Sequence, residues 1–160
     1  MRHLNVLWDQ GSIDISAIER FERKIGYRFP ENYKKLLSAH DHLMIEEDTF
    51  KFKNIYGKED ARDVAFYGYG QTCLEKIENS QNFGIYGYEG IVAIGRSANG
   101  DQVCFDYRHD PTTTEPHVVL VYHDDSIIDE SGDEKMAVNF VAPNFEAFVD
   151  MLYEYIDEED

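Results

Sequence analysis

The 160 residues include 32 acidic and 15 basic side chains, a formal net charge of −17, so the chain repels nucleic acid and anionic lipid, whose recognition depends on Lys and Arg. With 42% hydrophobic and 14% aromatic residues the chain can build a core, which excludes an intrinsically disordered protein. Cys73 and Cys104 are too few for a disulfide framework, and no apolar run suits a signal peptide or a membrane helix, so we expect one cytoplasmic domain over residues 1–160.

The first predicted helix covers residues 12–25. Its apolar residues recur at spacings of three and four, as on one face of a helix: Ile15, Ile18, Phe21 and Ile25. Either Ser16, followed by Glu19 in the pattern of a capping box, or Ser12 one turn earlier begins the helix. We expect Gly26 to end it at a positive φ.

A second helix is predicted from Pro30, whose missing N–H costs nothing in a first helical turn, to about residues 39–42. Its buried stripe consists of Tyr33, Leu36 and Leu37. Alternating apolar and polar residues then predict a strand over residues 49–55 with one exposed face.

The middle of the chain gives weaker signals. Residues 56–70 are rich in Gly, Tyr and charge and predict a long loop. We expect a helix over residues 72–82, with Leu74 and Ile77 turned inward.

The β signals follow. Residues 90–95 and 101–107 flank Asn99-Gly100, a pair typical of tight turns between antiparallel strands. Further strands are predicted over residues 118–122 and 136–140, with an acidic loop, residues 124–134, between them.

A last helix is predicted from a cap at Asn144, with apolar residues continuing to Ile156, and residues 157–160 form an acidic tail. Two helices first, strands in the middle and one helix at the end predict an α+β fold. In this fold two N-terminal helices and a C-terminal helix pack on a sheet rich in antiparallel strands.

No catalytic constellation is evident. Gly68-Tyr69-Gly70 resembles the opening of a dinucleotide-binding motif, but Cys73 replaces its third glycine. His40-Asp41-His42 offers two metal ligands where a site needs three or four, so a solvated helix end explains it better, and the sequence predicts neither metal nor cofactor. His109 and His123 lie near carboxylates, as a hydrolase would require, and this leaves a hydrolase open as one hypothesis. No activated nucleophile accompanies these histidines, however.

Two features remain as candidates for partner binding. Tyrosines flanked by glycines suit either the centre of an interface or the edge of the core, and the sequence leaves both open for Tyr67, Tyr69, Tyr86 and Tyr88. The charge is uneven as well, since residues 1–61 hold 11 acids and 10 bases whereas residues 62–160 hold 21 acids and 5 bases. This acidity serves either solubility or the steering of a basic partner, for which the candidates are Asp124, Asp125, Asp129 and Glu130.

The order of motifs over residues 13–156 resembles that of the SUKH superfamily, typified by the yeast cell-wall assembly regulator. The matching motifs are Ile18-x-x-Phe21-Glu22-x-x-Ile25-Gly26, Phe29-Pro30-x-x-Tyr33-x-x-Leu36-Leu37, Ile91-x-x-Ile94-Gly95, Asn99-Gly100-Asp101-x-x-Cys104-Phe105-Asp106 and Asn144-Phe145-x-x-Phe148. One departure is His40-Asp41-His42, where the family commonly has Asn-Gly-Gly.

The resemblance implies an α+β fold without enzymatic activity and a role as an immunity protein that neutralises a bacterial toxin, often a nuclease. Regulatory or scaffolding domains with other protein partners are the alternative within the same superfamily. The acidic composition supports the first role independently, because nucleases carry basic clefts for phosphates.

Overall fold

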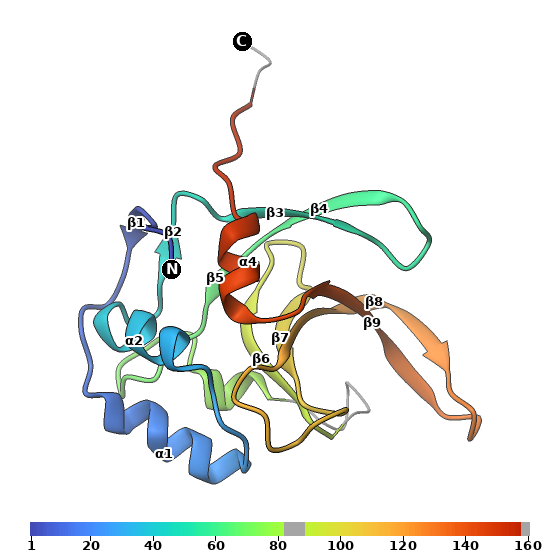
Figure 1. The fold of residues 1–160 in the computed structure, drawn as a ribbon, viewed down its shortest axis with the longest axis horizontal. Coiled ribbons are helices and arrows are strands. Elements are labelled where there is room, and N and C mark those ends of the chain that lie inside the picture. Colours follow the sequence, from blue (N-terminus) through green and yellow to red (C-terminus); the bar gives the residue numbers. More distant parts are fainter. Residues whose placement is uncertain (82–88, 158–160) are drawn as a thin grey trace.

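The computed structural model describes residues 1–81 and 89–157 (Figure 1). These residues form an α+β fold with antiparallel sheets, as predicted. The largest sheet has the strand order β5 (Ala65–Phe66), β6 (Ile91–Arg96), β7 (Gln102–Asp106), β8 (His117–Ile128) and β9 (Glu134–Ala142). Two smaller sheets pair β1 (Val6–Trp8) with β2 (Met44–Ile45) and β3 (Thr49–Lys53) with β4 (Glu59–Asp63).

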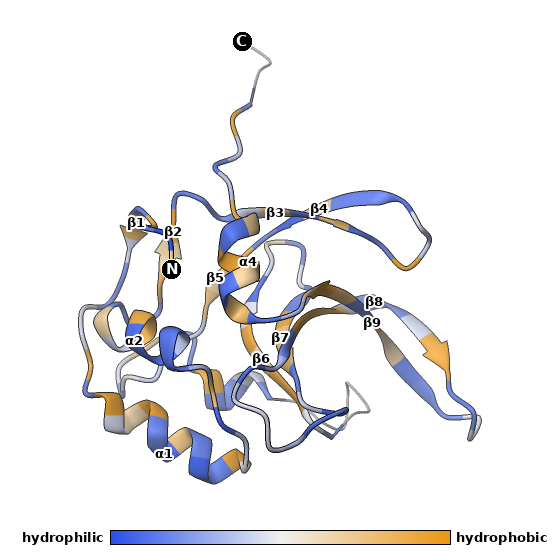
Figure 2. Ribbon diagram, in the orientation of Figure 1, coloured by the Kyte–Doolittle hydropathy of each residue, from blue (hydrophilic) through white to orange (hydrophobic). Residues whose placement is uncertain are grey.

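Both N-terminal helices are confirmed, with corrected starts. Helix α1 (Ile15–Ile25) shows apolar residues recurring along its length (Figure 2). Asp14 caps it, rather than Ser12 or Ser16, because its extended backbone directs the carboxylate onto the Ser16 N–H at 2.9 Å. Helix α2 (Glu31–Ala39) begins one residue after Pro30, whose ψ of 142° is not helical.

Gly26 ends α1 at a φ of +82°, and its N–H donates to the Glu22 carbonyl at 2.9 Å. No atom lies within 4 Å of the position that a Cβ would occupy, so a side chain here is penalised by backbone strain alone. We expect Gly26→Ala to lower the free energy of unfolding by about 1–2 kcal/mol and the thermal midpoint with it. Gly26→Asn should lose less, because Asn tolerates this conformation better. An unchanged or raised midpoint for Gly26→Ala would contradict the assignment.

Two predictions for the middle of the chain are wrong. Residues 56–70 contain β4 and β5, which pair with β3 and β6. In place of a helix over residues 72–82, the described part of that range contains only a 3₁₀ turn, η1 (Ile77–Ser80). Gly68 explains the difference, because its N–H and carbonyl pair with Glu75 and Ile77 and so draw this segment out of helical geometry.

The central hairpin β6–β7 is confirmed, and Asn99-Gly100 lies in its turn. Strands β8 and β9 are also confirmed, but both are longer than predicted. Cys104 in β7 is fully buried, as expected for a small thiol among apolar neighbours.

Helix α2 and the C-terminal helix pack on the large sheet through aromatic rings. The fully buried ring of Phe105 in β7 lies 5.1 Å from that of Tyr33 in α2 and 6.0 Å from that of Phe145, the first residue of α4 (Phe145–Met151). Asn144 caps α4 as predicted, its side chain accepting the Ala147 N–H at 2.8 Å.

Helix α4 ends five residues earlier than the apolar pattern predicts. Tyr153 exchanges two backbone hydrogen bonds with Thr49 of β3, which requires extended rather than helical backbone. Ile156 is consequently exposed. None of the helices formed by residues 1–81 and 89–157 is long and apolar enough to cross a bilayer.

Candidate protein-binding surface

Strands β8 and β9 continue beyond the sheet as a projecting hairpin (Figure 1). Residues 124–134 of this hairpin, here named the acidic arm, contain six acidic and no basic residues. The prediction of a loop over these residues is wrong, because Ser126 and Ile128 pair with Met136 and Glu134 across the hairpin. The charge is thus carried on paired strands joined by a short turn.

The four acids expected to steer a partner all lie on this arm: Asp124, Asp125, Asp129 and Glu130. The first and last are exposed, and the middle two are half-buried. Asp129 closes the turn, with the Lys135 ammonium and the N–H groups of Ser131 and Asp133 each 2.9 Å from its carboxylate. The hydrogen bond from Lys135, followed by those from the backbone, holds the pKa of Asp129 below its ordinary value.

Apolar side chains are exposed among these charges. Ile127 and Ile128 are 45% and 76% exposed. Tyr56, in the turn between β3 and β4, is 67% exposed and donates a hydrogen bond to the Asp125 carboxylate. A surface of acids with interspersed aliphatic and aromatic groups can both attract a basic protein and bury apolar area against it.

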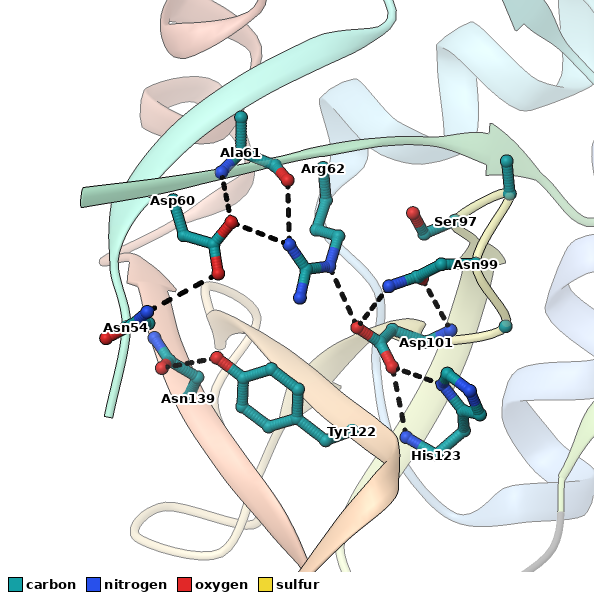
Figure 3. A network of polar contacts seen from close by, with 12 residues as sticks. Asn54, Asp60, Ala61, Arg62, Ser97, Asn99, Asp101, Tyr122, His123 and Asn139 are labelled. Carbon is teal, nitrogen blue, oxygen red and sulfur yellow. Dashed lines mark hydrogen bonds and ion pairs between the residues drawn. The ribbon is translucent and has the colours of Figure 1, made fainter. Parts of the chain in front are cut away.

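The base of the arm is fixed by a buried carboxylate, Asp101 (Figure 3). Pairing between β8 and β9 is interrupted between Val121 and Ser126, and His123 in this bulge donates its backbone N–H to Asp101 Oδ1 at 3.0 Å. The His123 ring nitrogen Nδ1 lies 2.6 Å from the same oxygen. The arm therefore begins at a bulge that is tied to the turn after β6.

The other oxygen of Asp101 joins this network to β4. Arg62 Nε donates to Asp101 Oδ2 at 2.9 Å, and Arg62 also pairs with Asp60 at 2.8 Å. Burial raises the pKa of Asp101, but hydrogen bonds from His123, Arg62 and Asn99 outweigh that effect and hold the pKa below its ordinary value. Three hairpins therefore meet at one ionised carboxylate.

This cluster also has the composition of a metal site, since Asp101, His123 and Asp124 each offer a ligand atom within 4.8 Å of the others. Both Asp101 oxygens already accept N–H donors, and one donor is the Arg62 guanidinium. A metal ion bound there would have to displace the Arg62 guanidinium from Asp101. We therefore assign Asp101 a positioning role, and His123 the role of one of its hydrogen-bond donors.

Two of the tyrosines expected to dock a partner, Tyr67 and Tyr69, lie away from the acidic arm. Tyr67 is buried, and its hydroxyl donates to Gln102 of β7. Tyr69 is half-buried, with its hydroxyl 2.6 Å from that of Tyr33 and its ring edge-on to Phe21. The structure places these two rings at the edge of the core, which is one of the two positions that the sequence left open. Residues 82–88, with Tyr86 and Tyr88, lie outside the described part of the chain.

The His40-Asp41-His42 turn is a structural anchor. The buried Asp41 carboxylate accepts the N–H groups of Tyr69 at 2.7 Å and Gly70 at 3.0 Å. The two imidazoles have separate partners, Asp9 for His40 and both Gln10 and Glu75 for His42. They do not converge on a common metal position.

The same contacts explain Gly68-Tyr69-Gly70, which resembled part of a dinucleotide-binding motif. A Cβ on Gly70 would lie 2.7 Å from an Asp41 carboxylate oxygen, and one on Gly68 would lie 2.5 Å from the Cys73 sulfur and 3.0 Å from the other Asp41 oxygen. Glycine is needed at both positions for close approach to this carboxylate.

The thiols offer no activated nucleophile. Burial raises the pKa of both Cys73 and Cys104, so neither is poised as a thiolate. The acids of the arm are evident from the charge of the sequence, whereas Arg62 and the role of Asp101 are not. The usable signal for Asp101 was an acid placed directly after an Asn-Gly turn, at the start of an apolar strand.

The sequence that forms this architecture matches a known protein family. The family model described as the SMI1 / KNR4 family (SUKH-1) matches residues 12–151, from the loop before α1 to the end of α4. A search of curated proteins found no match. The family match confirms the resemblance that the motifs indicate: the chain belongs to the SMI1 / KNR4 family (SUKH-1).

Proposed function

We propose that this chain is a non-enzymatic protein-binding domain that acts in the cytoplasm as an immunity protein. Its partner in this proposal is a bacterial toxin with a basic surface, and a nuclease is the class whose phosphate-binding cleft fits best. The observation that carries the proposal is the acidic arm, which presents six carboxylates and two exposed isoleucines on a projecting hairpin. A regulatory or scaffolding domain with a partner other than a toxin is the alternative.

The arm combines two physical effects that act on different rates. Its carboxylates attract a basic partner over a distance that added salt shortens to about 8 Å near physiological ionic strength, which speeds association. Ile127, Ile128 and Tyr56 can bury apolar area after contact, which slows dissociation. The Asp101 network supports both effects, because a surface that is already ordered loses less entropy on binding.

The partner can be obtained by affinity capture on the immobilised chain at low salt from a lysate of the source organism. The main retained protein is then expressed alone and together with the chain. An immunity function predicts that the retained protein arrests growth when expressed alone and that co-expression restores growth. A retained protein without toxicity would favour the regulatory alternative.

We predict that neutralising Asp124, Asp125, Asp129 and Glu130 to Asn or Gln slows association with that partner and flattens its dependence on salt. The lifetime of the complex should change little, because the apolar contacts remain. Surface plasmon resonance at several salt concentrations separates the two rates. The matched control neutralises four other exposed acids in and after α4: Glu146, Asp150, Glu154 and Asp157. Equal slowing by both sets would show that net charge, and not the arm, governs association.

A further inference from the structure

The strand β1 exposes three consecutive apolar residues. Val6, Leu7 and Trp8 are 39%, 64% and 45% exposed, and the ribbon of β1 is coloured as apolar at the margin of the fold (Figure 2). Val6 and Trp8 pair with the consecutive residues Ile45 and Met44, so Leu7 is the extra residue of a β-bulge, and all three side chains remain exposed to solvent. Trp8 makes an edge-on contact with His42 at 5.2 Å but remains nearly half exposed.

The edge of β1 that faces away from β2 has no strand partner in residues 1–81 and 89–157. An exposed apolar edge is a ready template for another strand, because its backbone N–H and carbonyl groups are unpaired and its side chains gain from burial. A two-stranded ribbon is only marginally stable in water, so a third strand would also stabilise β1 and β2 themselves. These features mark β1 as an interaction surface distinct from the acidic arm.

We propose that β1 pairs with β1 of a second copy of the same chain. Charge favours this occupant over a basic protein. Residues 62–160 carry a net −16, whereas residues 1–61 carry a net −1, and β1 itself is uncharged. In Figure 1, β1 lies on the opposite side of the fold from the β8–β9 hairpin. A basic partner is attracted to the arm, and two copies of this chain repel each other least when their N-terminal regions meet.

The sequence of β1 also suits pairing with itself. An antiparallel pair related by a two-fold axis at Leu7 places each Val6 opposite Trp8 of the second copy and the two Leu7 side chains opposite each other. Aromatic and β-branched residues form favourable cross-strand pairs. The flanking positions pair Asn5 with Asp9, so no like charges face each other across the two-fold axis. Both acidic arms stay free, and the dimer presents two partner sites.

Sedimentation equilibrium on the full chain, at concentrations up to about 1 mM and at two salt concentrations, tests the proposal. The expected mass at high concentration is twice 18.6 kDa. Added salt should tighten the dimer, because it screens repulsion between two chains of charge −17, whereas it should weaken a complex with a basic partner. This opposite response distinguishes self-association from the partner binding proposed above.

Leu7→Lys places two ammonium groups opposite each other and should raise the dissociation constant of the dimer at least about tenfold. Ile128→Lys is the matched control, with the same charge change at a 76% exposed residue of the arm, and should leave the dimer intact. Leu7→Thr introduces a β-branched side chain that favours a strand but lacks the apolar area of Leu, and it should weaken the dimer less. A monomeric mass at every concentration, or equal weakening by Leu7→Lys and Ile128→Lys, would overturn the proposal. The thermal midpoint of each variant reports that it folds.

Discussion

Tyr33→Ala is expected to lower the free energy of unfolding by about 3–5 kcal/mol, the range measured for large buried aromatic residues. Its ring is fully buried and lies 5.2, 5.1 and 5.3 Å from those of Phe29, Phe105 and Phe145, so it joins α2 to both β7 and α4. Urea denaturation at pH 7 measures the loss. Tyr155→Ala is the matched control, since this residue is 66% exposed and its removal should cost less than about 0.5 kcal/mol. Comparable losses from the two variants would rule out this account of the core.

Tyr33→Phe isolates the hydroxyl that lies 2.6 Å from that of Tyr69. The substitution should cost about 1 kcal/mol, the net contribution of one hydrogen bond. It should also change how the free energy of unfolding declines at alkaline pH. Burial raises the pKa of both tyrosines above the ordinary value of 10.0, so the unfolded chain releases these protons first. Their contribution is complete below pH 10 and declines as the pH rises further, and Tyr33→Phe should lessen that decline.

Arg62→Ala is expected to lower the free energy of unfolding by about 3 kcal/mol, because it leaves the buried Asp101 carboxylate without its guanidinium partner. The control is Lys24→Ala, which breaks an exposed ion pair with Glu78 and should change stability by less than about 1 kcal/mol. Similar losses in urea denaturation would show that the Asp101 network contributes no more than a surface pair.

The pH dependence of Arg62→Ala gives a second readout. In the native chain the lowered pKa of Asp101 stabilises the fold at pH values above the ordinary carboxyl pKa of 3.8, and this contribution is lost as the pH falls through the folded-state pKa. Without Arg62 the pKa of Asp101 should rise toward its value in the unfolded chain, so both the pKa shift and the acid-induced loss of stability that it causes should be smaller. Urea denaturation at pH 7, 4 and 3 measures the shift. An acid limb identical to that of the native chain would contradict the role of Arg62.

The elements predicted correctly are those whose signal is local. Apolar spacings of three and four indicate α1 and α2, Asn99-Gly100 marks the turn of the central hairpin, and Asn144 marks the start of α4. In each case the residues that define the element also make its own hydrogen bonds and its buried face. The family resemblance depends on the same residues and was therefore visible in the sequence.

Elements defined by a distant partner were missed or misplaced. The strand β4 is polar along its length and becomes a strand only by pairing with β3. Residues 72–82 have an apolar pattern that fits a helix, but Gly68 takes the backbone carbonyl of Glu75 and the N–H of Ile77 as its hydrogen-bond partners. α4 ends where Tyr153 pairs with Thr49, more than 100 residues away in the chain.

The candidate surface likewise combines properties that are local in the sequence with properties that depend on distant residues. The acidity of residues 124–134 is evident in the sequence, because charge is a property of composition. Their position on a paired hairpin fixed at Asp101 depends on the folded chain, since the partners Arg62 and His123 come from other strands. The fold also buries Tyr67 and packs Tyr69 against the core, because a tyrosine can be buried where a distant polar group, here Gln102 or Tyr33, satisfies its hydroxyl.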